Sequence, residues 1–342
     1  MWIIATRWNC RMSSISTTQV SPVFIFSLPR AGSTLLQRML AADPRIDTAS
    51  EPWILLPFFY TTRSEGIFTE YYQRSASRAL DDFCGRLPNG RADLQEAIKL
   101  GAEYLYNLAC QKEALYFVDK TPRYHLIVED IISTFGDEAK YIFLWRNPIS
   151  VMHSMLTTWT NNRWELYRYR VDLYKGMSNL TTSFERHSST SIQVRYEDLV
   201  QSPTSVIANI MGYLDLPFES SVFENWESVR LSGRMGDPTG TVQYKNVSNE
   251  PVNKWTSQPL NSVRRTYYRN YLHWLGADRL ALMGYSLGQL LDELDAVPAT
   301  SSGVIRDRIW SLFGRLHPII EPTIAKTKMR SARQSQRMYP HG

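Results

Sequence analysis

The chain has 342 residues, of which 43% are hydrophobic and 21% charged, a composition that is typical of a globular protein and excludes a disordered chain. No run approaches the roughly 18 apolar residues of a membrane span, and three scattered cysteines exclude a disulfide framework or a zinc site. The net charge of +5 is uneven, because residues 296–342 alone carry eight Lys/Arg against two acidic residues. The rest of the chain is nearly neutral, so we expect no nucleic-acid partner, and any anion site must be built from individually placed residues.

The two ends of the chain are predicted to lie outside the main domain, which we expect to span residues 21–295. Residues 1–20 lack the basic start and the sustained apolar stretch of a signal peptide. We interpret them as a loose leader, with Met12 as an alternative start of the protein. This interpretation predicts a cytoplasmic location.

Residues 296–342 form a basic tail that is predicted to contain an amphipathic helix. Apolar residues recur there at helical spacing with arginines between them, at Val304, Ile305, Ile309, Leu312, Phe313 and Leu316 and at Arg306, Arg308 and Arg315. Two interpretations stay open. The helix docks on its own domain, or it is an interfacial membrane helix or an arm that binds a partner.

The body of the chain alternates strand and helix patterns. Short runs of β-branched and aromatic residues predict strands at 23–27, 46–50, 115–118, 140–145 and 191–195. Helical patterns are found at 33–41, 91–112, 124–135, 148–159, 163–187 and 203–214. This alternation predicts an α/β fold in which a parallel sheet has helices on both faces and binds its ligand at the carboxyl ends of the strands. Residues 54–112 are predicted to be a helical insertion that covers the site.

The first strand runs into Ser27-Leu-Pro-Arg-Ala-Gly-Ser-Thr-Leu35, a loop that is suited to bind a phosphate. The free N–H groups at the start of the following helix point at the anion, and the helix dipole favours negative charge. Gly32 lets the backbone approach closely, and Ser33 and Thr34 add hydroxyl donors. An ordinary capped turn would explain these three residues alone, but Arg30 beside them favours an anion site.

The loop resembles the ATP-type P-loop and departs from it at two decisive points. Ser27 stands where the first glycine of that motif would be, and no lysine follows Gly32. A kinase that uses Mg·ATP needs that lysine on the terminal phosphates and an acidic residue for the metal. The departures therefore count against a P-loop kinase, which remains the alternative enzyme.

The segment Pro29-Arg-Ala-Gly-Ser-Thr-Leu-Leu36 resembles the 5′-phosphosulfate loop of sulfotransferases, which use 3′-phosphoadenosine 5′-phosphosulfate (PAPS). Its arginine is similar to that of the tyrosylprotein sulfotransferase branch and its bacterial relatives. The resemblance implies the sulfotransferase fold, and it implies that one end of PAPS is held by Arg30, Ala31, Gly32, Ser33 and Thr34.

A second loop resembles the 3′-phosphate motif of the same family. Arg146 follows the strand at 140–145, and Ser154 stands eight residues later, about two turns into a helix that begins with Pro148. The arginine offers a charge-assisted fork and the serine a hydroxyl to one phosphate. The alternative is a helix-capping arginine and a core serine.

Three weaker matches extend the resemblance over about residues 22–285. The first is Val118-Asp-Lys-Thr-Pro122, where Lys120 would face the sulfuryl group unless it is a surface lysine in a turn. The second is Val194-Arg-Tyr-Glu-Asp-Leu199, which would place Tyr196 near the nucleotide or simply start a helix. The third is Pro251-Val-Asn-Lys-Trp255, where Lys254 would lie near the phosphates.

The acceptor needs a general base, and two residues are candidates. Glu51 stands 21 residues after Arg30, a spacing that matches the catalytic glutamate of the tyrosylprotein branch, and Pro52 and Trp53 follow it. His125 is the alternative, by similarity to the histidine of the small-molecule branch. The six histidines and three cysteines are dispersed, so we expect no metal site.

Together these features predict a PAPS-dependent sulfotransferase that works by in-line transfer to a hydroxyl or amine acceptor and releases 3′-phosphoadenosine 5′-phosphate (PAP). Glu51 is the predicted base, and Arg30 and Lys120 stabilise charge. The acceptor could be a small molecule, a glycan or a peptide. The alternatives are a P-loop kinase and a non-catalytic protein that binds a nucleotide or docks on a membrane through its basic tail.

Overall fold

Five parallel strands form the central sheet of the computed structural model, which describes residues 19–64, 67, 73–111, 113–224, 226–231 and 254–320. The strands are β1 (Ser21–Phe26), β2 (Ile46–Thr48), β3 (Tyr116–Asp119), β4 (Lys140–Trp145) and β5 (Ser191–Arg195). Their order in the sheet is β2-β3-β1-β4-β5. The predicted parallel α/β sheet is confirmed. Because β1 lies between β3 and β4, the loops that follow these three strands meet at one edge.

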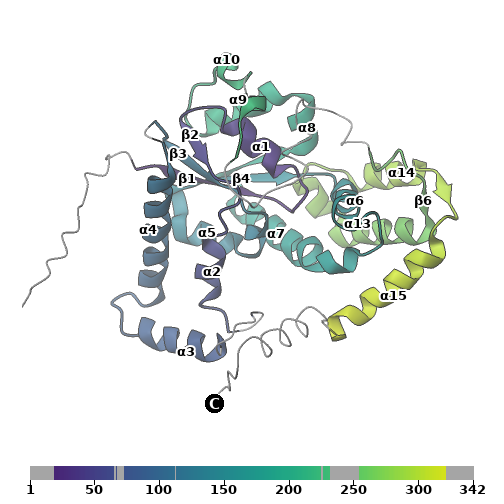
Figure 1. Cartoon of the computed structure of the whole chain (residues 1–342), viewed down its shortest axis with the longest axis horizontal. Coiled ribbons are helices and arrows are strands. Elements are labelled where there is room, and N and C mark those ends of the chain that lie inside the picture. Colours follow the sequence, from purple (N-terminus) through teal and green to yellow (C-terminus); the bar gives the residue numbers. More distant parts are fainter. Residues whose placement is uncertain are drawn as a thin grey trace, which may run out of the picture.

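Helices cover both faces of the sheet, because the side chains of its strands alternate between two hydrophobic clusters (Figure 1). In β1, Val23 and Ile25 belong to one cluster, and Phe24 and Phe26 belong to the other. The first cluster is covered by α1 (Ser33–Leu40), α8 (Tyr196–Gln201) and α9 (Pro203–Tyr213). The second is covered by α4 (Arg91–Ala109), α5 (Val128–Phe135), α6 (Pro148–Trp159) and α7 (Met177–His187).

The predicted helix at 163–187 is divided into three pieces. A 3₁₀ turn at Leu166–Tyr169 leads into a π-helix at Val171–Gly176, and α7 follows. The π-helix packs against His125, and a Cβ on Gly176 would lie only 2.6 Å from the imidazole ring. The predicted continuous helix is therefore interrupted where it packs closely against the buried ring of His125. No local sequence pattern reveals this contact.

The segment between β2 and β3 contains α2 (Leu55–Tyr60), α3 (Gln73–Cys84) and α4. The helix α4 packs beside the sheet, where the Tyr106 hydroxyl donates a hydrogen bond to Asp119. The helix α2 begins four residues after Glu51, with the Leu55 amide bonded to the Tyr124 hydroxyl. It is α2, therefore, that adjoins the predicted site.

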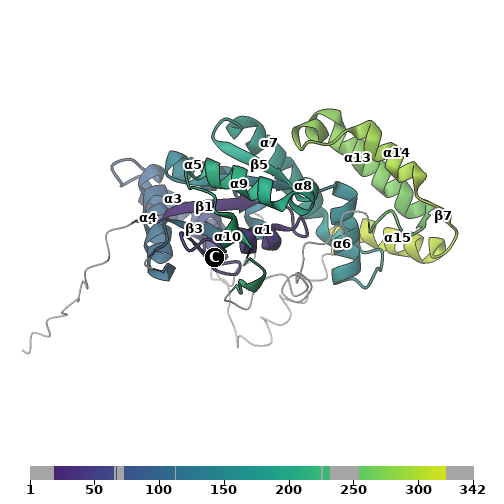
Figure 2. The ribbon, with the colours of Figure 1, turned by 90° about the horizontal axis from the view of Figure 1, so that it is seen from above.

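The C-terminal helices lie at the opposite end of the molecule from α3 and α4, as two perpendicular views show (Figure 1 and Figure 2). They are α13 (Ser262–Leu282, kinked at Gly276), α14 (Leu287–Ala296) and α15 (Val304–Ile320). Two short strands, β6 (Leu260–Asn261) before α13 and β7 (Ala299–Thr300) before α15, pair with one another. Elsewhere in the chain, the four-residue helix α10 (Ser220–Phe223) follows α9.

The start of the predicted tail is anchored to the main domain. The carboxylate of Asp307 is fully buried and accepts hydrogen bonds from Arg264 at 2.6 Å and from Asn261 at 2.8 Å. Most of the leader and residues 321–342 of the tail lie outside the described residues. Within the described part of the chain, no helix combines the length and apolarity that a membrane span requires.

Candidate active site

The loop after β1 has the geometry of an anion site. Gly32 is the N-cap of α1, has a φ of 97°, and no side chain caps the first N–H groups of this helix. A Cβ at this position would lie 2.3 Å from the ring of Tyr196, so both the backbone angle and the neighbouring ring require glycine. Ser33 and Thr34 begin the helix, and the amide of Ala31 is bonded to the Leu28 carbonyl within the loop.

The side chain of Tyr196 packs against this loop. Its side chain is fully buried, and the guanidinium of Arg146 stacks on its ring at 4.2 Å from the centroid. The ring thus packs against Gly32 and against the Arg146 guanidinium. We interpret Tyr196 as a support that fixes the loop and the arginine.

Arg30, Arg146 and Ser154 lie together, although they are far apart in the sequence. Arg146 donates a hydrogen bond to the Arg30 carbonyl at 2.8 Å, and Arg30 Nε donates to Ser154 Oγ at 3.2 Å. Arg30 thus connects Arg146 and Ser154, because its carbonyl accepts from Arg146 and its side chain donates to Ser154. The side chain of Arg30 points to this pair, whereas the sequence assigned Arg30 to the other end of the nucleotide.

Lys120 and Glu51 form a second cluster at the same edge. Lys120 Nζ lies 2.9 Å from Glu51 Oε1 and donates to Thr34 Oγ1 at 3.2 Å. The other carboxylate oxygen of Glu51 accepts the indole N–H of Trp53 at 3.2 Å. Only 1% of the Lys120 side chain and 11% of the Glu51 side chain are exposed. Lys120 is thus no surface lysine, and Trp53 holds the Glu51 carboxylate through its indole N–H.

Three non-glycine residues of these clusters adopt left-handed backbone angles. The φ values are 69° for Arg30, 27° for Glu51 and 60° for Trp53. Such conformations cost about 1–3 kcal/mol each and persist where the surrounding structure fixes them. Their presence at the two clusters marks this edge of the sheet as the candidate active site.

Gln37 fixes the segment that carries Glu51, a role that sequence reasoning missed. From inside α1, its amide donates to Thr48 Oγ1 at 2.6 Å and to the Ala49 carbonyl at 2.8 Å. The Trp53 amide is in turn bonded to Thr121 Oγ1 at 3.2 Å. The sequence carries no pattern that would have indicated this role of Gln37.

Asp119 immediately precedes Lys120 in the chain, and its side chain is fully buried. It accepts hydrogen bonds from the hydroxyl groups of Tyr106 at 2.7 Å and Tyr124 at 2.8 Å. Burial raises the pKa of this carboxyl to about 6, although the hydrogen bonds and the nearby charge of Lys120 lower it. No motif in the sequence indicates this role of Asp119, because the packing of α4 and of the turn after β3 brings the two tyrosines to it.

His125, the alternative base, lies in the protein interior. It is fully buried, and its Nε2 lies 2.7 Å from the equally buried Asp172. Arg123 pairs with the same carboxylate at 3.1 Å. This environment fixes the π-helix against the turn after β3, so we interpret His125 as a structural histidine.

Glu197 connects the Arg146 loop to the C-terminal helices. Its carboxylate accepts the Asn147 amide at 3.0 Å and the Tyr285 hydroxyl at 2.6 Å. The side chain of Asn147 caps α6 by accepting the amides of Ile149 and Ser150. The helix that carries Ser154 is therefore held at its first turn from two directions.

Lys254 lies in an exposed turn before β6. Burial and neighbouring positive charges, with that of Lys254 first among them, lower the pKa of His153 to about 4. His153 precedes Ser154 in α6, so Lys254 adds positive charge beside the Arg146–Ser154 pair. Among the described residues, no group of three His, Cys, Asp or Glu side chains is placed to hold a metal ion.

The fold and the site define an α/β protein with a loop suited to an anion after its first strand, and the comparisons with known proteins identify its family. The model of the sulfotransferase family matches residues 22–220, which is more than half of the chain. The chain therefore belongs to the sulfotransferase family and is a sulfotransferase enzyme, as the sequence resemblance predicted. This result sets aside the kinase and the non-catalytic alternatives.

Two relatives and one solved structure illustrate the similarity. The chain is 28% identical to nodulation protein NoeE of Sinorhizobium fredii over 298 residues, which cover 78% of this chain and 67% of NoeE. It is 24% identical to a protein-tyrosine sulfotransferase of Drosophila melanogaster over 254 residues, which cover 71% of this chain and 48% of that protein. The sulfotransferase domain from the curacin biosynthetic pathway shares the fold, with a TM-score of 0.50, 24% identity, and coverage of 78% of this chain and 98% of that domain.

Proposed function

We propose that this sulfotransferase transfers the sulfuryl group of PAPS to a hydroxyl or amine acceptor, with Glu51 as the general base. The observation that carries the proposal is the contact of Lys120 with both Glu51 and Thr34. It places a carboxylate, a buried cation and the start of α1 at one point. A general base can take the proton of the acceptor, and a cation and a helix N-terminus can stabilise the negative charge that develops in a group transfer.

The two clusters suit the two ends of PAPS. The start of α1, with Gly32, Ser33 and Thr34, would hold the phosphosulfate, because its first N–H groups have no side-chain cap. Arg146 and Ser154 would hold the 3′-phosphate through a fork and a hydroxyl. Arg30, whose side chain is bonded to Ser154, would span the distance between the two ends.

The proposed reaction is a direct displacement at sulfur. The acceptor oxygen or nitrogen bonds to sulfur while its proton passes to Glu51, and the bond between sulfur and the 5′-phosphate oxygen breaks. PAP leaves with the electron pair of that bond. Lys120 and the amides of α1 stabilise the negative charge on the departing oxygen, and the ion pair with Lys120 orients Glu51 for the acceptor. These cations supply the stabilisation, so the proposal includes no metal.

The acceptor is proposed to carry its hydroxyl or amine on a small molecule, a glycan or a peptide. The similarity to protein-tyrosine sulfotransferases supports the inclusion of peptides in this set. Trp53 contacts Glu51 directly and is partly exposed, so an aromatic wall lies beside the proposed base. We further propose that the enzyme acts in the cytoplasm.

Calorimetry tests the donor site, with PAP as ligand and adenosine 5′-monophosphate (AMP) as its matched control without the 3′-phosphate. We expect PAP to bind far more tightly than AMP, and equally well with and without EDTA. Incubation with labelled PAPS and panels of phenols, sugars and peptides then tests transfer. Equal affinity for PAP and AMP, or PAP binding that EDTA abolishes, would contradict the proposal.

A further inference from the structure

The helix α15 has an uncovered apolar face. Its exposed side chains include Ile305 (78% exposed), Ile309 (51%), Leu312 (60%), Phe313 (55%) and Leu316 (43%). Their spacing places them on one stripe along the helix, about 100° wide. We call these five residues the α15 stripe. A globular protein normally turns such a stripe toward its core, whereas here it faces outward.

The opposite face of α15 is fixed to the domain. Asp307 is buried with Arg264, and Ser311 accepts the indole N–H of Trp164 at 3.1 Å. A Cβ on Gly314 would lie 2.9 Å from Tyr167, so the two elements are in close contact. These contacts occupy the side of the helix opposite to the stripe. The stripe therefore cannot turn inward without breaking a buried ion pair.

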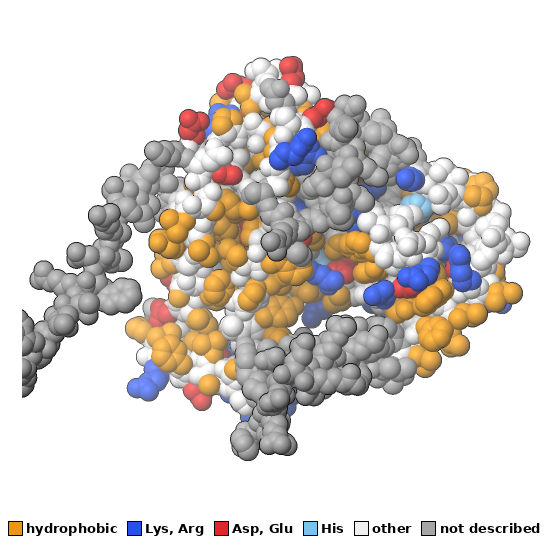
Figure 3. Space-filling view, viewed as in Figure 1, with side chains coloured by type: hydrophobic (Ala, Val, Ile, Leu, Met, Phe, Trp, Pro, Cys, Tyr) orange, Lys and Arg blue, Asp and Glu red, His pale blue; other side chains and the backbone are white. Residues whose placement is uncertain are grey.

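Positive charges flank the stripe. Arg306, Arg308 and Arg315 are exposed, and the acidic residue of this part of the helix, Asp307, is buried. In the space-filling view, hydrophobic side chains gather over α15 at the lower right with Lys and Arg side chains beside them (Figure 3). The sequence that follows, residues 321–342, adds five Lys/Arg against one acidic residue.

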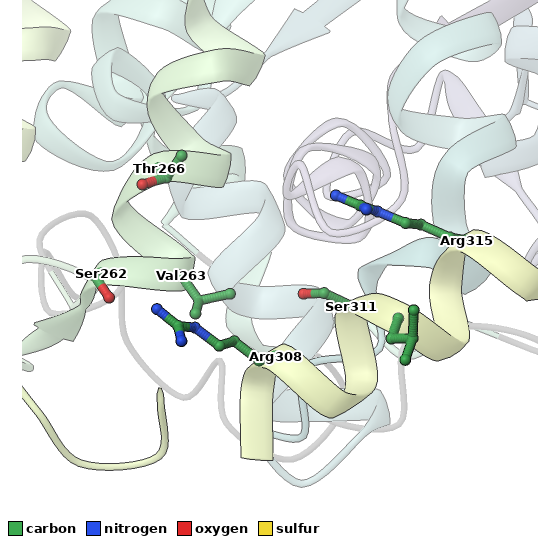
Figure 4. Close-up of a pocket in the computed structure, with 7 residues that line it drawn as sticks. Ser262, Val263, Thr266, Arg308, Ser311 and Arg315 are labelled. Carbon is green, nitrogen blue, oxygen red and sulfur yellow. The ribbon is translucent and has the colours of Figure 1, made fainter. Parts of the chain in front are cut away.

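Two of these arginines extend over a groove between α13 and α15 of about 520 Å³. Figure 4 shows Arg308 reaching toward Ser262 and Val263 of α13, with Ser311 and Arg315 directed into the same groove. Guanidinium groups beside hydroxyl groups suit a phosphate ester. The groove thus offers cationic partners immediately next to the apolar stripe.

We propose that α15 docks this enzyme on an anionic membrane surface. The stripe enters the boundary between headgroups and acyl chains, and Arg308 and Arg315 contact the phosphates of anionic lipids. An amphipathic helix with cationic flanks, continued by a polybasic segment, has the composition that binds such surfaces. The surplus of positive charge favours a lipid surface over a second copy of this chain, whose α15 would carry the same charges.

The exposed face of α4 provides a matched comparison. Leu100 is 55% exposed and Leu108 is 58% exposed, close to the values for Phe313 and Leu312. Glu103 lies between them in the sequence, and the nearby Lys99 is buried in an ion pair with Glu138. This face therefore has exposed apolar side chains without the cationic flanks.

Flotation of the full-length protein with vesicles tests the proposal, using phosphatidylcholine alone and phosphatidylcholine mixed with phosphatidylserine. We expect binding to the mixed vesicles only. Leu312→Ser with Phe313→Ser should weaken it on the order of thirtyfold. Arg308→Glu with Arg315→Glu should weaken it by at least roughly 25-fold, since each basic residue is worth about fivefold. The matched controls Leu100→Ser with Leu108→Ser and Arg78→Glu with Arg86→Glu should bind like the wild type.

PAP titration of each variant reports whether it is folded, independently of the membrane. Binding of the wild type to neither vesicle overturns the proposal, as does undiminished binding by either α15 variant. Light scattering adds one further outcome. A wild-type dimer that the Leu312→Ser and Phe313→Ser changes convert to a folded monomer would identify the stripe as an interface between two copies, and would also overturn it.

Discussion

The ammonium nitrogen of Lys120 lies 2.9 Å from a carboxylate oxygen of Glu51, and both side chains are shielded from solvent. Lys120 comes from the end of β3, whereas Glu51 comes from the loop after β2, 69 residues earlier. The strand order places β2 beside β3, so the parallel sheet itself brings the two residues together. The positive charge of Lys120 and the negative charge of Glu51 therefore compensate one another in this shielded position.

The change Glu51→Gln tests the general base. Glutamine keeps the size and much of the hydrogen bonding of glutamate but cannot accept the acceptor's proton. We expect kcat to fall by about 10²–10⁴-fold, while the Kd for PAP stays nearly unchanged. The pH–rate profile should also lose its acidic limb, which reports the ionised base. Steady-state kinetics and PAP titration measure these effects.

A change of His125, the alternative base, completes the test of Glu51. Because His125 is buried against Asp172, we expect His125→Asn to lower the melting temperature of the protein. At temperatures where the variant is folded, its turnover should be largely intact. Normal turnover in Glu51→Gln, together with lost turnover in a folded His125→Asn protein, would show that the histidine is the base.

A double-mutant cycle tests the ion pair itself. Lys120→Met removes the cation, keeps a long side chain and leaves Glu51 without its charge partner. Breaking a buried pair costs about 3 kcal/mol of unfolding free energy. The double variant Lys120→Met with Glu51→Gln should recover most of that loss and remain inactive. Denaturant unfolding gives the energies, and additive losses would mean that the two charges do not stabilise one another.

The 3′-phosphate assignment predicts a ligand-dependent effect of Arg146→Ala. We expect PAP affinity to fall by about 1.5–3 kcal/mol, the value of a hydrogen bond to a charged group. AMP, which lacks that phosphate, should lose far less. Calorimetry with both ligands separates the two. Equal losses would show that Arg146 acts by holding the Arg30 carbonyl and the loop, not by binding the phosphate.

The tight packing beneath the anion loop makes Gly32→Ala costly. The new methyl group would lie 2.3 Å from the Tyr196 ring, at a φ of 97°. We expect a loss of at least about 1–3 kcal/mol of unfolding free energy, the range for such backbone strain, and weaker PAP binding. Gly212→Ala in α9 is the control, because a Cβ there would meet no atom within 4 Å apart from its chain neighbours and the backbone of its own helix. It should raise stability by about 1 kcal/mol. Equal effects of both changes on stability would refute the prediction.

Asp119 predicts a pH-dependent stability. Its pKa in the folded protein is about 6, above the value of 3.8 that is usual for an aspartate. Between these values the unfolded chain loses the proton that the folded protein keeps. The contribution of Asp119 is therefore fully present below about pH 4 and is lost as the pH rises through about 6, by up to roughly 3 kcal/mol.

Asp119→Asn removes this titration. The difference in unfolding free energy between wild type and Asp119→Asn should therefore fall as the pH rises from about 4 to about 6, and then level off. Chemical denaturation across this range measures it. The exposed Asp82→Asn provides the control, for which the difference from wild type should stay flat. A flat difference for Asp119→Asn as well would mean that Asp119 is ionised throughout.

The sheet and its two loops were predictable from the sequence because their signals are local. Each buried strand is a short apolar run, and the loop motifs follow the strands directly. The direction of the Arg30 side chain was not predictable, since it is set by a contact with Ser154, 124 residues away. The support of Glu51 by Gln37 and the pairing of His125 with Asp172 likewise depend on packing between separate elements, for which no local pattern exists.

The family match ends at residue 220, yet one carboxylate oxygen of Glu197 is held by Tyr285. The other oxygen holds the amide next to Arg146, so a residue of the C-terminal helices helps to set the proposed nucleotide site. Exchange of acceptor-binding segments between sulfotransferases is therefore best made with the helices up to α14 retained. A chimera joined at the end of the family match would inherit Glu51, Lys120 and the loops of Arg30 and Arg146, but it would lose the Tyr285 hydroxyl group that holds Glu197.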